Sequence, residues 1–95
     1  MYKSIFTFDV DPGKQEEYLK VTAEKIKPYW ETHGCRSYNV WQMDGGNTFI
    51  KEMLFEDAEE KDNLFGFEDE EADAMRKLWR SFMDDYTLKF YVQKV

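Results

Sequence analysis

The stretch 35-CRSYNVWQMDGGNTFIKEMLF-55 decides the fold, because it contains two extended segments joined by a tight loop. We predict strands over Cys35–Met43 and Thr48–Phe55. The Asp44–Asn47 loop between them is predicted to form a hairpin, since Gly and Asn tolerate positive φ angles. The two strands should therefore pair antiparallel.

The strand Thr48–Phe55 is apolar on both of its faces. Phe49 and Met53 point to one side, and Ile50 and Leu54 point to the other. A strand of this kind is usually covered on both sides. This expectation governs the architecture that we infer for the whole chain.

The flanking segments supply two further strands and the helices. Apolar residues recur at three- and four-residue steps in the predicted helices and alternate in the predicted strands. Pro28 lies inside the first helix and should kink it or start a fresh turn. The expected elements are a strand over Tyr2–Val10, a helix over Pro12–Thr32, a short helix from Asp57 to Phe65, a helix over Asp69–Asp84 and a strand over Tyr86–Val95.

The resulting order is β-α-β-β-α-β. It predicts an α+β protein of the ferredoxin-like class, with a four-stranded antiparallel sheet and both helices on one face. Residues 1–95 should form a single domain, because the length suits one hydrophobic core and no linker or repeat interrupts the pattern.

Composition excludes several classes of partner. The net charge is −7, and Glu56–Asp73 holds ten acidic residues against one lysine. No basic cluster is present, so we expect no binding to nucleic acid or to a membrane. The acidic residues lack ligand spacing, so we expect no metal site. The single Cys35 allows no internal disulfide, which fits a cytoplasmic protein.

The second face of the sheet predicts a homodimer. Two helices can cover only one face. The other face would carry either Arg36, Tyr38 and Val40 or Trp41 and Met43 from the first strand of the hairpin, and either Ile50 and Leu54 or Phe49 and Met53 from the second. Either set would leave a large apolar patch in water. Pairing with a second copy of the chain, sheet against sheet, would remove that patch from water.

The segment Val10–Lys14, followed by Glu17 and Tyr18, resembles the first strand-to-helix junction of the dimeric α+β barrel superfamily. That group includes the antibiotic-biosynthesis monooxygenase-like proteins. The resemblance implies a dimeric barrel and a choice among cofactor-free oxygenation, haem degradation, isomerisation, mutarotation and no catalysis. A fold of this kind restricts function very little.

Two of these activities lack their residues here. Haem degradation in the superfamily uses an Asn on the first strand, where this chain has Phe6, and a His on the second helix, which has none. The region around His33, Tyr38 and Asp44 resembles L-rhamnose mutarotases. That family has a working His on its first helix, where this chain has Thr22, and a Thr side chain cannot shuttle protons near neutral pH.

No catalytic residue can be assigned from the sequence, but aromatic and charged side chains provide candidates for ligand binding. The candidates are Trp30, His33, Tyr38, Trp41, Lys51, Arg76 and Trp79. We expect Trp41 and Trp79 to line opposite walls of one cleft.

Three of the candidates are charged or titratable. His33 is either a general base or a cation at the end of a helix. Lys51 and Glu52 point to opposite faces of their strand, so one of them should enter a buried layer. Arg76 is either an anchor for an acidic ligand or the partner of Asp73 in a salt bridge on the helix surface.

The function that we predict is the binding of a small aromatic or apolar compound in a cleft between helices and sheet. Cofactor-free monooxygenation and isomerisation are the candidate reactions, and no cofactor is expected. One alternative is a non-catalytic dimerisation or regulatory module that fills the cleft with its own side chains, and another is a mutarotase-like sugar enzyme. An open cavity would favour a ligand-binding protein over a filled module.

Overall fold

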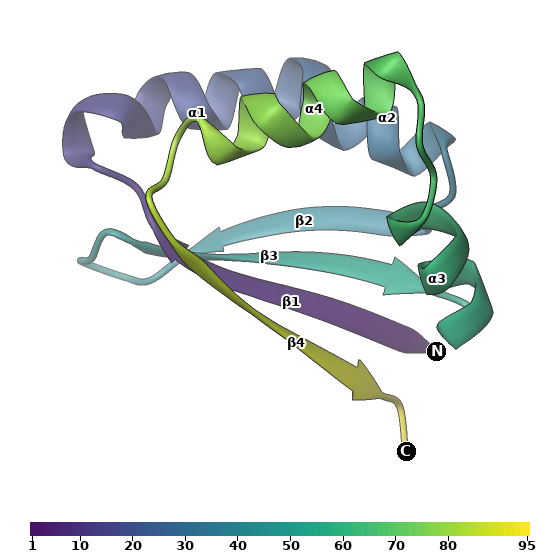
Figure 1. The fold of residues 1–95 in the computed structure, drawn as a ribbon. Coiled ribbons are helices and arrows are strands. Elements are labelled where there is room, and N and C mark those ends of the chain that lie inside the picture. The colour runs from purple at the N-terminus through teal and green to yellow at the C-terminus, as the bar shows by residue number, and fades with distance from the viewer.

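The computed structural model describes residues 1–95 and shows a four-stranded antiparallel sheet with its long helices on one face (Figure 1). The sheet order is β2-β3-β1-β4, and every neighbouring pair is antiparallel. This confirms the ferredoxin-like α+β fold. The strands are β1 (Tyr2–Asp9), β2 (Ser37–Gln42), β3 (Thr48–Phe55) and β4 (Tyr86–Val92).

The first helical segment is interrupted where Pro28 enters it. The segment comprises a 3₁₀ turn η1 (Pro12–Lys14), α1 (Gln15–Val21), a π-helical turn η2 (Thr22–Ile26) and α2 (Lys27–Thr32). The Lys27 N–H donates to the carbonyl of Thr22, five residues back. Proline has no N–H and clashes with the carbonyl four residues earlier, and a wider turn relieves both problems. The break expected at Pro28 is therefore a π turn placed directly before it.

The second half of the chain forms the remaining helices, α3 (Ala58–Phe65) and α4 (Glu70–Arg80). Asp57 and Asp69 each accept a hydrogen bond from the backbone N–H three residues on, at the start of α3 and of α4. Gly66 follows α3, as expected. The last helix is shorter than its apolar pattern predicted, because the chain turns after Arg80. Phe82 still packs into the core from that turn.

The core lies between the sheet and the helices and is mostly aromatic. Phe8 of β1 and Phe49 of β3 stand opposite each other in the register, with ring centroids 6.1 Å apart. Tyr18 of α1 packs edge-on against both rings. Trp79 of α4 meets Phe8 at 5.2 Å. These contacts fix both helical segments against the same face of the sheet.

The register settles which residues face away from the helices. Tyr38 pairs with Met53 and both are buried, whereas Trp41 pairs with Ile50 on the far face. Trp41 is 59% exposed there. The far face therefore carries Trp41 from β2 and Ile50 and Leu54 from β3, which is one of the alternatives left open for each strand. None of the helices is both long enough and apolar enough to cross a membrane.

We predict that Asp69→Ala lowers the free energy of unfolding by about 1 kcal/mol, because the cap of α4 loses its acceptor. Asp11→Ala is the matched control. Asp11 occupies the position before η1, but its side chain accepts no capping hydrogen bond. Urea denaturation of both variants measures the difference. Equal losses in the two variants would contradict the role of Asp69 as a cap.

Candidate functional site

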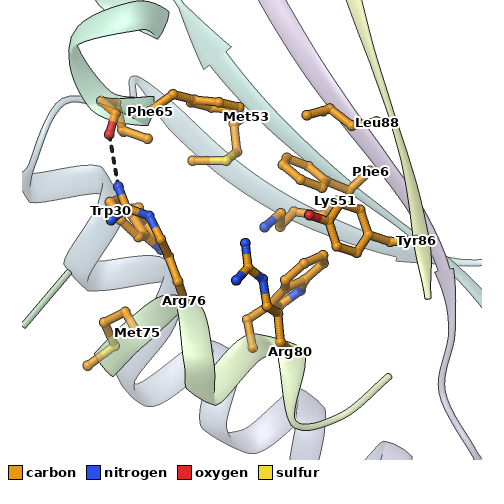
Figure 2. Close-up of a pocket in the computed structure, with 12 residues that line it drawn as sticks. Phe6, Trp30, Lys51, Met53, Phe65, Met75, Arg76, Arg80, Tyr86 and Leu88 are labelled. Carbon is orange, nitrogen blue, oxygen red and sulfur yellow. Dashed lines mark hydrogen bonds between the residues drawn. The ribbon is translucent and has the colours of Figure 1, made fainter. Parts of the chain in front are cut away.

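A cavity of about 200 Å³ lies between the sheet and the helices, bounded by β1, β3 and β4 below and by α2, α3 and α4 above. Nine of its twelve lining residues are hydrophobic. Figure 2 shows rings from both layers facing the same space. The lining residues are Phe6, Trp30, Lys51, Met53, Leu64, Phe65, Met75, Arg76, Trp79, Arg80, Tyr86 and Leu88.

Lys51 forms the polar floor of this cavity. It lies between Phe49 and Met53 on the helix-facing side of β3, so strand alternation carries its amine inward. The side chain is only 6% exposed. Its Nζ lies 3.9 Å from the ring centroid of Phe6 and 3.7 Å from that of Trp79. It makes no ion pair or hydrogen bond with the chain.

Burial lowers the pKa of Lys51 to about 7, and the positive charge of Arg80 contributes in the same direction. The ring faces of Phe6 and Trp79 oppose this shift, because an aromatic face attracts only the charged amine. Near neutral pH the site therefore holds both the neutral amine and the ammonium form. A buried lysine with a pKa in this range is suited to accept and return a proton.

The two arginines of α4 have different roles. Arg76 donates hydrogen bonds to the carbonyls of Leu64 at 3.2 Å and Phe67 at 2.7 Å, and pairs with Asp73 at 3.2 Å. It thus fixes the connection between α3 and α4 that closes one side of the cavity. Arg80 makes no ion pair, and its guanidinium points into the cavity (Figure 2).

Of the two interpretations of Arg76 from the sequence, the salt bridge is present, whereas the binding of an acidic ligand stays a prediction. The surface pair with Asp73 is present, and the side chain also lines the cavity. Its guanidinium lies 5.3 Å above the ring of Trp30. Because its donors are already engaged with backbone carbonyls, Arg76 is better suited to hold the wall than to bind a ligand.

The structure brings together four of the seven residues singled out from the sequence: Trp30, Lys51, Arg76 and Trp79. Tyr38 lies beneath them, fully buried, with its ring centroid 5.5 Å from the Lys51 Nζ. His33 is exposed at the end of α2, where it stacks on Tyr29 at 4.0 Å and does not reach the cavity.

The expectation that Trp41 and Trp79 line opposite walls of one cleft is wrong. Trp41 follows Val40 in β2, and alternation sends its indole to the face without helices. There its Nε1 donates to Glu52 at 2.8 Å. Strand alternation could not reveal this from the sequence alone, because both faces of the hairpin carry large apolar groups.

Sequence reasoning missed Phe6 and Arg80 as parts of the site. Phe6 pairs with Lys51 across β1 and β3 and with Leu88 across β1 and β4, so the strand register alone brings it to the floor. Arg80 follows Arg76 by four residues and so shares its helix face. That spacing was visible in the sequence.

Other reactive groups do not assemble into a second centre. Burial raises the pKa of the Cys35 thiol to about 11, and the thiol donates to the carbonyl of Ser37 at 2.8 Å. It is therefore protonated at neutral pH. Thr22, at the position of the mutarotase His, is buried, and its hydroxyl has no hydrogen-bond partner. No three His, Cys, Asp or Glu side chains gather in a group that could hold a metal ion.

A family model described as antibiotic biosynthesis monooxygenase matches residues 1–63. No functionally curated protein is detectably similar to the chain in sequence. Among solved structures, a monooxygenase from Streptomyces coelicolor (gene ActVA-Orf6), in complex with the ligand nanaomycin D, superposes with a TM-score of 0.79. It is 18% identical over 99% of this chain and 88% of its own.

Two further solved structures have the same fold. One is described as an antibiotic biosynthesis monooxygenase and has a TM-score of 0.75 at 15% identity, with both chains covered completely. The other is an uncharacterised NIPSNAP domain protein from Burkholderia xenovorans, with a TM-score of 0.73 at 20% identity over 99% of this chain and 95% of its own. At these identities the superpositions establish the fold alone.

We predict that Lys51 makes the stability of the protein depend on pH. Unfolded lysine has a pKa of about 10.4, whereas that of folded Lys51 is about 7. Between these values only the unfolded chain binds the proton, so stability rises with pH. Relative to Lys51→Met, the free energy of unfolding of the wild type should rise from pH 7 to pH 9 by about 1.4 kcal/mol per pH unit.

The measurement is chemical denaturation of both proteins at several pH values in that range. The difference between the two isolates Lys51, because the other titrating groups are common to both. A constant difference from pH 7 to pH 9 would show that the buried amine keeps an ordinary pKa.

Proposed function

Because the chain belongs to the antibiotic biosynthesis monooxygenase family, we propose that it binds a small aromatic compound in the cavity under α4 and oxygenates it with dioxygen. In this reaction the substrate itself reduces the dioxygen, and the protein supplies a dry site and a proton acceptor. No cofactor takes part.

The observation that carries this proposal is the aromatic cavity with one unpaired amine at its floor. Its volume of about 200 Å³ suits a compound of one or two rings, since an apolar cavity of roughly 150 Å³ binds benzene. A module that used these aromatic residues only for packing would fill such a space with its own side chains. The open volume supports a ligand.

The proposed reaction begins with proton transfer to Lys51. The neutral amine takes a proton from an acidic O–H or C–H of the substrate, and the resulting anion is electron-rich enough to reduce dioxygen. For a substrate methylene flanked by rings, the balance is CH₂ + O₂ → C=O + H₂O. One oxygen atom enters the product and the other leaves as water. Lys51 then returns its proton.

A solved relative supports a small organic ligand. The Streptomyces coelicolor monooxygenase shares this fold and holds nanaomycin D. Isomerisation is the second candidate, because a lysine that accepts and returns a proton could move it between two substrate atoms without dioxygen. Consumption of dioxygen distinguishes the two reactions. Mutarotation has less support, since Thr22 provides no proton shuttle.

We predict that Lys51→Met lowers turnover of hydroxylated naphthalenes by about 10²- to 10⁴-fold, because general-base catalysis contributes in that range. Lys20→Met, at an exposed position on α1, is the matched control and should keep full activity. In the wild type, kcat/KM should rise with pH and level off above a midpoint of about 7, as Lys51 loses its proton.

An oxygen electrode measures turnover, and ¹⁸O₂ labelling shows whether one atom enters the product. Binding of aromatic compounds, followed by quenching of tryptophan fluorescence, is measured separately. If none of these compounds binds the cavity, the proposed function is wrong. Binding followed by isomerisation without dioxygen uptake would replace oxygenation with the second candidate.

We also propose that the chain acts as a homodimer joined through the far face of the sheet. Trp41 is 59% exposed and Tyr91 is 49% exposed on that face, beside the half-buried Ile5, Ile50 and Leu54. Its central charges already satisfy each other, since Lys3 pairs with Glu52 at 2.9 Å. Exposed rings and aliphatic groups on one sheet face, with an ion pair among them, favour a second copy of the same face, sheet against sheet.

We expect the wild type to run as a dimer in size-exclusion chromatography with light scattering. Ile50→Lys should convert it to a monomer, because the new charges of the two copies would be buried in the interface. Glu24→Lys, at an exposed position on the helical side, should leave the dimer intact. A wild type that stays monomeric at every concentration would rule this interface out.

The cytoplasm is the compartment that we propose for this protein. Its single cysteine is free and buried, and it can form no disulfide within the chain. A reducing environment suits such a thiol.

A further inference from the structure

We propose that Lys51 is also a nucleophile, which condenses with the carbonyl group of a small aromatic aldehyde or ketone to form an imine in the cavity. This goes beyond the proposed function, in which Lys51 only accepts a proton. It gives the chain a covalent chemistry that oxygenation does not need.

The position of the amine carries this inference. Lys51 is buried, has no hydrogen-bond or ion-pair partner, and lies on the boundary of the cavity. The rings of Phe6 and Trp79 flank its Nζ at 3.9 Å and 3.7 Å. Figure 2 shows the remaining side of the nitrogen turned towards the open space. A carbonyl carbon in the cavity could therefore approach the lone pair without displacing any protein contact.

Burial favours the neutral, nucleophilic form of the Lys51 amine, and the positive charge of Arg80 acts in the same direction. Arg80 and Arg76 face the cavity from α4, and Tyr86 faces it from β4. Tyr38 lies behind the amine on β2, and the Cys35 thiol precedes that strand. No carboxylate lines the cavity, so nothing holds the ammonium form in an ion pair. Lysines that form Schiff bases are activated in the same way, by an apolar pocket or a neighbouring cation.

The step balances without any oxidant or cofactor. The nitrogen lone pair attacks the carbonyl carbon, and the carbonyl electron pair moves to oxygen. A proton passes from nitrogen to that oxygen, and water leaves as the C=N bond forms. The hydroxyl of Tyr86 and the guanidinium of Arg80 point to the same space (Figure 2) and can stabilise the departing oxygen. The aromatic walls limit access of water and so slow hydrolysis of the imine.

The carbonyl compound should be aromatic and compact. Nine hydrophobic residues line the cavity, and its volume of about 200 Å³ matches a compound of one or two rings. A planar ring can stack among Trp30, Phe65 and Tyr86, which come from three different elements. An aliphatic sugar aldehyde would leave its hydroxyl groups without partners against these walls.

Reductive trapping tests the inference. The full-length protein is incubated under argon with 4-hydroxybenzaldehyde and sodium cyanoborohydride at pH 7, and the adduct is followed by intact-protein mass spectrometry and peptide mapping. We expect one stable adduct per chain, on Lys51. At pH 7, a lysine with a pKa of about 7 has roughly a thousandfold more neutral amine than one with a pKa of about 10.4. We expect the rate of labelling at Lys51 to exceed that at each other lysine by at least roughly a hundredfold.

Three variants separate this chemistry from surface labelling. Lys51→Met should remove the fast adduct, whereas Lys20→Met should label like the wild type. Arg80→Gln should slow labelling at pH 7 several-fold and at pH 9 much less, because losing the neighbouring charge lets the pKa of Lys51 rise. Circular dichroism and thermal melting establish that each variant is folded.

Labelling that spreads over many lysines and is unchanged in Lys51→Met would overturn the inference. So would tight binding of the aldehyde without a reducible adduct. Because the reaction runs without dioxygen, its outcome does not depend on oxygenation. If the adduct forms but the oxygen electrode detects no dioxygen uptake, the imine chemistry is supported and the proposed function is wrong. If dioxygen is consumed but no adduct forms, the proposed function is supported and the imine chemistry is wrong.

Discussion

The burial of Lys51 is the constraint on which the candidate site depends. Strand β3 alternates strictly, so Phe49, Met53 and Phe55 can face the helices only if Lys51 does too. A one-residue slip would place the amine in water but would expose the aromatic core. Burying an unpaired amine costs free energy. The two ring faces and the adjacent cavity lower the free-energy cost of burying the charged amine. Loss of the proton lowers this cost further, because the neutral amine is easier to bury. The residue whose burial is least favourable for stability is therefore the one to which we assign a chemical role.

The rest of the scaffold keeps a space open above this amine. The π turn before Pro28 allows the first helical segment to continue, so that Trp30 reaches the end of the cavity. Arg76 fixes the connection between α3 and α4 through two backbone carbonyls. Neither feature touches the Lys51 nitrogen. Both features determine the shape of the space that a ligand would enter. Binding sites typically combine a rigid scaffold of this kind with a few side chains that contact the ligand.

The family and the fold restrict the set of possible reactions less than the cavity does. The fold is shared with monooxygenases and with an uncharacterised NIPSNAP domain protein, and one fold commonly supports unrelated reactions. The aromatic cavity with its single unpaired amine is the feature that supports the proposed ligand over a purely structural module. Oxygenation, isomerisation and imine formation all begin from that amine in its neutral form. They differ in the next step. In oxygenation the amine accepts a proton and dioxygen then reacts, in isomerisation it accepts a proton and returns it, and in imine formation it attacks a carbonyl carbon.

The sequence by itself determined the element order, the hairpin at Asp44–Asn47 and the class of the fold, because these depend on local patterns of apolar residues, Gly, Asn and Pro. It also showed that either Lys51 or Glu52 must be buried. Only the tertiary structure decided which one, because both faces of β3 are apolar and the choice rests on the register that pairs Lys51 with Phe6 and Val40. For the same reason, the sequence-based prediction placed Trp41 in the cleft, whereas it lies on the far face. Strand register and helix packing bring together residues that are distant in the chain, and they place Phe6, Tyr86 and Arg80 in the site.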